Sequence, residues 1–393
     1  MTVSAALEAA TARPQGFDRK GLDRLAQSLQ ADAEAGQIPG AVVALWQAGR
    51  PLYSCSVGWL DVQRRHVMRP DALFRIFSMT KPLVSVAALQ WVERGRLGLD
   101  DEVVRHLPAF GHRDVTVRHL LMHTAGLAYG PRQHSSALRE TYARLGLGIH
   151  PRDMGAEAFL QALAQAPLTA PPGTQWDYGN ATDVLGLVVE AVSGLRLEAC
   201  LQAQIFQPLG MRETAFHIQA DDAQRLAHPL PFDPVDGSPV LVPDQTYDAL
   251  QPPALDSGGA GAVSTAQDYG RFAQALLDDL SGAGRLLQAG TARQMLSDQL
   301  GPRGIPAHPT PGEAALLSPG YGFGYGFAVR LPGETANLPG HAGSFLWSGT
   351  AGTLFWVDPA LDLVAVYMSQ APGASRQHYR RRVIEMVYGA LVR

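Results

Sequence analysis

Cysteine is scarce in this sequence: Cys55 and Cys200 are the only two among 393 residues. They lie far apart, without the spacing of a metal-ligand motif, and each falls in a segment that resembles a strand or a helix. We therefore expect two free thiols, because nothing in the pattern supports a disulfide or a cysteine metal site.

Charge and long apolar runs are also sparse. Charged residues make up 17% of the chain and the net charge is −4, with no long run of either sign. This balance excludes nucleic acid and anionic membrane surfaces as expected partners. Residues 380–382, three consecutive arginines, are the local exception, and we expect them on a solvated helix face. Without a membrane-length apolar run or a signal-like N-terminus, a cytoplasmic location is the expectation.

Apolar residues are plentiful, at 46% of the chain, which predicts a large core. Strand-like runs gather at the two ends of the chain: residues 40–46, 52–59, 322–331, 352–357 and 363–368. Helices are expected beside them at residues 17–35 and 376–392, whereas the pattern in the middle of the sequence predicts mostly helices and loops. The pattern predicts an α+β fold, with one antiparallel sheet built from both termini and flanked by helices. We place the α/β domain at residues 1–98 and 226–393, an inserted helical domain at 99–225, and the active site in the cleft between them.

The stretch from Ser78 to Lys81 carries the strongest chemical signal. Apolar residues recur at helical spacing over residues 83–92, Pro82 suits a first turn and Gly95 suits a helix end. Ser78 is therefore expected to open a buried helix with Lys81 one turn further on, on the same face. That arrangement is typical of a serine nucleophile activated by lysine. The alternative is a serine cap in a chance Ser-x-x-Lys pattern.

A second candidate motif is Tyr178-Gly179-Asn180, on a short loop before a predicted helix. Tyr178 and Asn180 are two residues apart and could both point into a cleft. A phenol beside an ammonium group loses its proton more readily, so Tyr178 could share the proton taken from Ser78. In the alternative, the Tyr178 ring packs in the core and Asn180 caps the helix.

Trp347-Ser348-Gly349 is the third candidate, directly before a strand-like run. A strand edge beside a nucleophile can offer a backbone N–H to an oxyanion, together with the N–H of Ser78. The alternative is a core tryptophan followed by a turn glycine.

In this order, the three motifs resemble those of the serine β-lactamase and penicillin-binding protein superfamily, most closely the family VIII carboxylesterases. The resemblance extends over nearly the whole chain and includes three further segments: residues 120–127 (LLMHTAGL), 207–211 (QPLGM) and 258–265 (GGAGAVST). It implies a β-lactamase-like fold. It also implies that the backbone N–H of Thr350 joins that of Ser78 in the oxyanion hole.

The resemblance predicts a serine carboxylesterase that hydrolyses short-chain esters through an acyl-enzyme on Ser78. Lys81 and Tyr178 would transfer protons, and Asn180 would hold Lys81 or the substrate. Trp347 stands where lactamases usually carry a lysine, so the cation for a substrate carboxylate is missing and an uncharged ester is favoured. The remaining alternatives are a β-lactamase, a D-aminopeptidase, an amide hydrolase or a non-catalytic penicillin-binding protein.

Trp347, Ser348, Gly349 and His341 complete the expected substrate-binding group, His341 because it lies close to Trp347 in sequence. No cofactor is expected. His119 and His123 have a zinc-compatible spacing, but Leu120 stands where a zinc protease carries glutamate, so no metal is expected either. The expected partner is a small-molecule ester, and the oligomeric state stays open.

Overall fold

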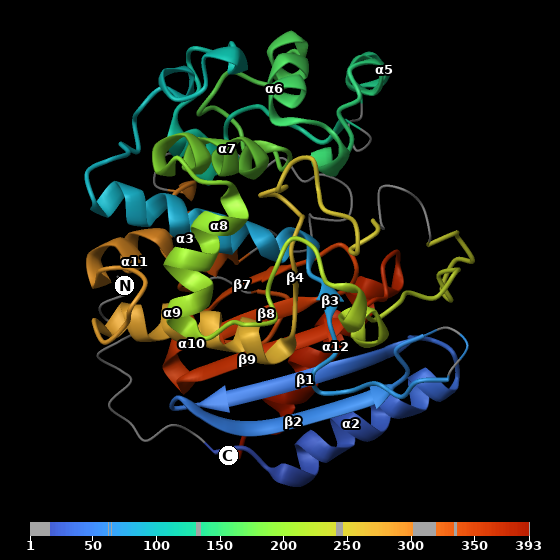
Figure 1. Ribbon diagram of the computed structural model, residues 1–393. Helices are drawn as coiled ribbons and strands as arrows, with labels where there is room; N and C mark the ends of the chain where they lie inside the picture. Colours follow the sequence, from blue (N-terminus) through green and yellow to red (C-terminus); the bar gives the residue numbers. More distant parts are fainter. Residues whose placement is uncertain are drawn as a thin grey trace.

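The computed structural model describes residues 16–61, 63, 65–130, 135–240, 247–301, 320–333 and 336–392. Its main feature is a seven-stranded antiparallel sheet with the strand order β2-β1-β9-β8-β7-β6-β5 (Figure 1). The strands are β1 (Gly40–Gln47), β2 (Arg50–Gly58), β5 (Tyr321–Phe323), β6 (Ala328–Arg330), β7 (Phe345–Ser348), β8 (Leu354–Asp358) and β9 (Leu363–Ser369).

The two ends of the chain meet in the middle of this sheet. β1 pairs with β9, with Val43 opposite Tyr367, and every residue of β9 is buried. Beyond the sheet, Phe17 forms a bridge with Leu391 and the Asp18 N–H donates to the Ala390 carbonyl at 2.7 Å. The α+β architecture with one antiparallel sheet built from both termini is therefore confirmed.

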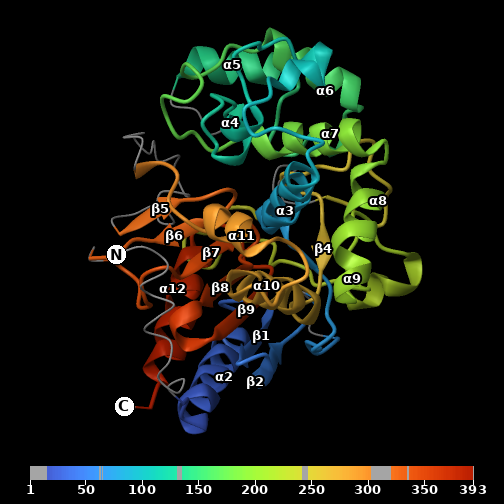
Figure 2. The ribbon, with the colours of Figure 1, turned by 90° about the vertical axis from the view of Figure 1, so that its left-hand side faces the viewer.

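Helices cover the sheet. α2 (Arg19–Glu34) is capped by Asp18 and buries an apolar row at Leu22, Leu25 and Leu29, as its sequence periodicity predicts. α12 (Ser375–Gly389) packs beside α2, whereas α10 (Ala266–Ser281) contacts β1, β8 and β9, and Figure 2 shows the sheet between α10 and α12. α11 (Ala289–Met295) lies against α10.

The middle of the chain forms a mostly helical region on one side of the sheet (Figure 1). Its helices are α4 (Val117–Leu121), α5 (Ser136–Arg144), α6 (Ala156–Gln165), α7 (Ala181–Ser193), α8 (Leu197–Leu201) and α9 (Gln207–Leu209). α3 (Thr80–Glu93) connects this region to the sheet domain by packing on α7 and α8. Nearly all of α3 is buried, so its flanks are held by both parts of the protein.

The structure corrects several expected elements. β7 was not expected as a strand, and residues 322–331 form two short strands because Gly326, at φ +95°, breaks the run. The helix α11, which follows α10, was also not expected.

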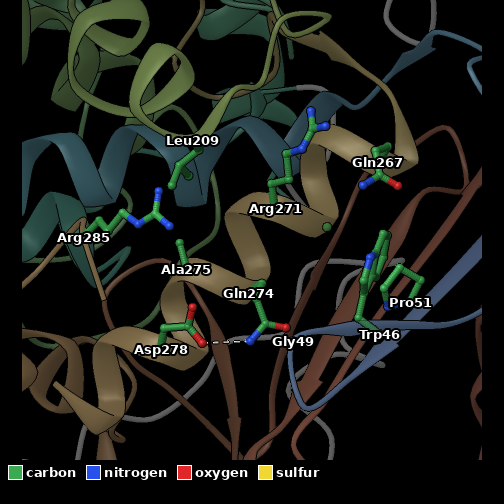
Figure 3. Close-up of a pocket in the computed structure, with 11 residues that line it drawn as sticks. Trp46, Gly49, Pro51, Leu209, Gln267, Arg271, Gln274, Ala275, Asp278 and Arg285 are labelled. Atoms are coloured by element: carbon green, nitrogen blue, oxygen red, sulfur yellow. Dashed lines mark hydrogen bonds between the residues drawn. The ribbon is translucent and has the colours of Figure 1, made fainter. Parts of the chain in front are cut away.

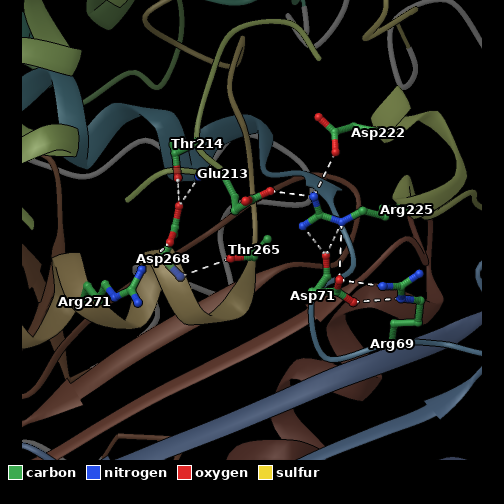
Figure 4. Close-up of polar contacts among 9 residues, drawn as sticks. All are labelled: Arg69, Asp71, Glu213, Thr214, Asp222, Arg225, Thr265, Asp268 and Arg271. Atoms are coloured by element: carbon green, nitrogen blue, oxygen red, sulfur yellow. Dashed lines mark hydrogen bonds and ion pairs between the residues drawn. The ribbon is translucent and has the colours of Figure 1, made fainter. Parts of the chain in front are cut away.

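A charged network anchors the chain just before the nucleophile motif (Figure 4). Arg225 binds Glu213 at 2.7 Å and Asp222 at 2.9 Å, and donates to the Asp71 carbonyl at 2.8 Å. The Leu73 N–H in turn donates to the Arg225 carbonyl at 2.8 Å. These bonds fix the chain that enters β3 (Phe74–Arg75), which pairs with β4 (Val263–Ser264).

Cys55 and Cys200 are free thiols, as expected. Among the described helices, none has both the length and the hydropathy that a membrane crossing requires.

Candidate active site

Ser78 lies in a short 3-10 turn, Phe77–Met79, between β3 and α3. The prediction that Ser78 opens the α-helix itself is therefore off by two residues, since α3 starts at Thr80. Phe77 has φ +45°, a conformation that a bulky residue rarely adopts and that stores about 1–3 kcal/mol. The backbone is thus held in a sharp bend just before Ser78, whose residue surface is 9% exposed.

Lys81 is fully buried and its amine reaches three groups. Nζ donates to Ser78 Oγ at 3.4 Å, to Tyr129 OH at 3.0 Å and to the Gly259 carbonyl at 2.8 Å. The predicted nucleophile and its predicted base are therefore in hydrogen-bond contact, at a length that commonly shortens when substrate binds.

Tyr178 lies beside this amine and is fully buried. Lys81 Nζ is 4.6 Å from the centre of the Tyr178 ring, and the rings of Tyr178 and Tyr129 meet edge to face at 5.7 Å. The Trp347 indole Nε1–H donates to Tyr178 OH at 3.3 Å. The structure therefore brings two predicted residues, Lys81 and Trp347, against the phenol side chain of a third, Tyr178.

Gly179 and Asn180 explain how Tyr178 reaches Tyr129. A Cβ on Gly179 would overlap the Leu127 carbonyl, so only glycine allows the two loops to pack so closely. Asn180 Nδ2 donates to the Ala128 carbonyl at 3.3 Å, next to Tyr129, and Asn180 Oδ1 is buried without a partner among the described residues. Asn180 therefore ties the two loops together, and it makes no side-chain cap bond to α7.

The end of β7 packs against the chain just before Ser78. A Cβ on Gly349 would overlap the Ile76 carbonyl, and Ala351 forms an apolar cluster with Phe77. Thr350 therefore lies in the segment that faces the nucleophile turn. Ser348 Oγ is buried, with no hydrogen-bond partner in the part of the chain described.

His341 lies elsewhere, which corrects its expected place beside the other site residues. Its Nδ1 binds Asp358 Oδ2 at 2.8 Å, and Tyr388 OH donates to the same oxygen at 2.6 Å. Ser348 pairs with Leu354 at one end of the β7–β8 pair, whereas Asp358 is at the other end. The hydrogen bond to Asp358 raises the pKa of His341 above 6.5.

Two residues of this site were not predicted from the sequence, Tyr129 and Asp183. Asp183 is buried, accepts from Ser257 Oγ at 2.5 Å and from the Gly259 N–H at 3.0 Å, and so holds the peptide segment whose carbonyl binds Lys81. Burial raises the pKa of Asp183, and the nearby Lys81 charge opposes that rise. Tyr129 lies on an irregular loop where no local pattern marks it; its place after the 120–127 motif is the only sequence signal.

His123 packs its ring on Tyr178 at 4.6 Å between centroids. Burial, reinforced by the Lys81 charge, holds the pKa of His123 well below 6.5, so the ring is neutral near pH 7. His123 therefore supports the phenol by packing and adds no second cation to the site.

A separate pocket of about 310 Å³ lies on the outer side of α10 (Figure 3). Trp46, Arg271, Gln274, Asp278 and Arg285 are among the residues that line it. Its lining includes no serine, cysteine or histidine, so it lacks a nucleophile and is distinct from the Ser78 site.

The fold and the Ser78–Lys81 pair define a class, the serine hydrolases of the β-lactamase superfamily. The Beta-lactamase family model matches residues 22–387, so the chain belongs to this family. Esterase EstB of Burkholderia gladioli is 35% identical over 399 residues, covering 92% of this chain and 94% of that protein. Lovastatin esterase of Penicillium rubens is 28% identical, covering 88% of this chain and 92% of that protein.

Solved structures agree with this assignment. EstCE1, described as a hydrolase with promiscuous acyltransferase activity, is 32% identical with a TM-score of 0.79, covering 94% of this chain and 99% of its own. Unliganded simvastatin synthase (LovD) of Aspergillus terreus is 26% identical with a TM-score of 0.72, covering 94% and 98%. The protein is therefore a serine hydrolase whose relatives include esterases and a hydrolase with acyltransferase activity.

Proposed function

We propose that this protein is a carboxylesterase that hydrolyses uncharged esters of short acyl chains through an acyl-enzyme on Ser78. The observation that carries the proposal is the contact of Lys81 Nζ with both Ser78 Oγ and Tyr129 OH, beside Tyr178. A buried amine next to a hydroxyl is suited to accept its proton when the amine is neutral.

Acylation begins when Ser78 Oγ attacks the ester carbonyl carbon and Lys81 takes the hydroxyl proton. The C–O bond to the leaving alcohol then breaks, and the proton returns to the alkoxide through Tyr178. Trp347 donates its indole N–H to the Tyr178 oxygen, so negative charge on that oxygen is stabilised during transfer. Water then attacks the acyl-enzyme, and the same groups take and return the proton.

The negative charge on the tetrahedral intermediate would be bound by the backbone N–H groups of Ser78 and Thr350. The close packing of Gly349 on Ile76 supports this arrangement, because it holds the residue after Gly349 near the nucleophile turn. Asn180 would act by fixing the loop that carries Tyr178.

Trp347 favours an uncharged ester. Its ring is fully buried between the rings of Tyr178 and Phe323, and its centroid lies 5.3 Å from the centroid of each. A substrate carboxylate next to this indole would lose hydration without meeting a cation there, whereas a neutral ester would not. A β-lactamase, a D-aminopeptidase and an amide hydrolase are the competing outcomes of the test.

The test compares p-nitrophenyl esters of increasing acyl length with nitrocefin. We expect kcat/KM to be highest for short acyl chains and much lower for nitrocefin. Ser78→Ala should abolish turnover, whereas Ser85→Ala, a matched buried serine on the same helix, should retain it. A phosphonate ester should add one adduct, on the peptide carrying Ser78. Higher kcat/KM for nitrocefin than for p-nitrophenyl butyrate, or an active Ser78→Ala variant, would overturn the proposal.

Acyl transfer to an alcohol is a second candidate, because the structurally similar EstCE1 is a hydrolase with promiscuous acyltransferase activity. An alcohol would replace water in deacylation, with no other change in the steps. Adding methanol to the p-nitrophenyl butyrate assay should then give methyl butyrate in the products. Butyrate alone would restrict the enzyme to hydrolysis.

A further inference from the structure

Two arginines of α12, Arg376 and Arg380, reach the end of β7. The burial of Arg380 corrects the expectation that residues 380–382 lie on a solvated helix face. Arg380, only 4% exposed, donates from Nη2 to the Gly349 carbonyl. Arg376 Nη1 donates to Thr350 Oγ1 at 2.6 Å and to the Thr350 carbonyl at 3.3 Å. One helix thus places two guanidinium groups on two successive carbonyls.

The Gly349 carbonyl belongs to a peptide group with a further role in the proposed function. This peptide is trans, because the described residues contain no cis peptide bond, so the Thr350 N–H points opposite to the Gly349 carbonyl. That N–H is the second donor of the proposed oxyanion hole. The carbonyl side of the same peptide accepts from Arg380 and from the Gly352 N–H at 3.0 Å.

We propose that Arg380, assisted by Arg376, is a positioning residue of the oxyanion hole. A cation bonded to a peptide carbonyl polarises the amide, and its N–H becomes a stronger donor. The guanidinium also fixes the direction of that N–H before substrate arrives, and such preorganisation stabilises an oxyanion. The inference rests on the proposed function, because it assigns Arg380 to the donor Thr350.

Neighbouring arginines provide the matched control. Arg381, next to Arg380 on the same helix, is exposed and pairs with Glu385 at 2.7 Å. Arg382 faces Asp32 and Ser28 on α2. Of these three consecutive arginines, Arg380 alone bonds to the β7 end in the described structure. Arg380→Met and Arg381→Met therefore remove the same charge from α12, one at a residue that contacts β7 and one at a residue that pairs with Glu385.

The experiment compares Arg380→Met, Arg380→Lys and Arg376→Met with Arg381→Met, using p-nitrophenyl butyrate and an alkylboronic acid. The boronate adduct on Ser78 is tetrahedral and places an oxygen in the oxyanion hole. We expect Arg380→Met to lower kcat by about 10- to 100-fold with KM within about 3-fold, and to weaken boronic acid binding by a similar factor. Arg380→Lys should recover part of both losses, Arg376→Met should show a smaller loss, and Arg381→Met should stay within about 2-fold of the unmodified enzyme.

A second readout separates positioning from folding. The infrared carbonyl stretch of an acyl-enzyme shifts to lower frequency as the oxyanion hole donates more strongly, so Arg380→Lys should shift it to higher frequency. This infrared measurement needs only that Arg380→Lys is folded, which its thermal unfolding midpoint checks. It therefore tests the proposal even where Arg380→Met is unstable. Unchanged boronic acid affinity and unchanged carbonyl frequency would overturn the role of Arg380. Absence of ester turnover in the unmodified enzyme would instead overturn the proposed function.

Discussion

The amine of Lys81 is buried among two phenol groups and a carbonyl, which makes its protonation depend on all of them. Groups coupled this closely exchange protons as a unit. We therefore expect Lys81, Tyr178 and Tyr129 to act together in the proposed proton transfer.

Lys81→Met and Tyr178→Phe should each lower kcat by about 10³-fold or more. The kcat of the double variant should be little below that of the less active single variant. The reason is that both residues serve one proton transfer. Steady-state kinetics with p-nitrophenyl butyrate measures this directly. Losses that multiply would assign the two residues independent roles.

Tyr129→Phe should lower kcat by about 10-fold, because the Lys81 amine loses an acceptor at 3.0 Å but keeps the Gly259 carbonyl. The control is Tyr142→Phe, another buried tyrosine, whose hydroxyl donates to the Pro167 carbonyl at 3.3 Å. Equal kcat for the two variants would remove Tyr129 from the proton-transfer unit.

Trp347→Phe should lower ester kcat by about 10-fold while retaining an aromatic ring. The Tyr178 oxygen would lose the indole donor at 3.3 Å, whereas the tilted contact between the two rings would largely persist. The pH profile of kcat gives the second measurement and should move upward in the variant. An unchanged kcat and profile would show that Trp347 only fills space.

At the scale of single residues, the sequence motifs predicted the site residues that lie close together in the sequence. Ser78 and Lys81 were predicted because helical spacing relates them, and Tyr178 because it lies two residues before Asn180 on a short loop that precedes a predicted helix. Tyr129 was missed because its contact with Lys81 spans 48 positions of sequence. His341 was predicted to lie at the site because it is close to Trp347 in the sequence. The prediction was wrong because His341 precedes β7, and the length of that strand separates it from the end that faces Ser78.

Among the elements, β7 matters most to the site, since it carries Trp347 and ends at the Gly349 contact with Ile76. Its four residues are too few to show an alternating pattern, which is why the strand was not expected. By contrast, β1, β9 and α2 are long enough for their periodicity to predict them.

Gly349→Ala should lower kcat by at least about 100-fold, because the added Cβ would overlap the Ile76 carbonyl and move Thr350 away from Ser78. Gly290→Ala on α11, where a Cβ meets nothing within 4 Å, is the control. It should keep full activity and stabilise the fold by about 0.5–1 kcal/mol. Thermal unfolding and kcat of both variants decide the matter, and an active Gly349→Ala would refute the packing argument.

Across the whole molecule, His341, Asp358 and Tyr388 join the loop before β7 to the end of the last helix. Asp358 is fully buried and accepts from both side chains. The assembly of the sheet from both termini was predictable because strand patterns lie at both ends of the sequence. This junction was not, because it depends on how α12 lies on the sheet.

The raised pKa of His341 predicts a pH-dependent stability. Its folded pKa lies above the ordinary 6.5, so the stabilisation is fully present below about pH 6.5 and is lost as pH rises through the folded value. Urea unfolding at about pH 6 and about pH 9 should show a smaller loss of unfolding free energy in His341→Gln than in the unmodified protein. Equal losses would show that the Asp358 contact adds nothing to stability.

The order of the elements along the chain, with α12 long after Ser78, also sets a timetable for biosynthesis. A ribosome delivers Ser78 and Lys81 well before β9, which pairs with β1, and α12, which bonds to Gly349. A nascent chain therefore holds its nucleophile long before the sheet around it can close. Under the proposed function, we expect ester turnover to begin only once α12 has been synthesised and has packed against the end of β7.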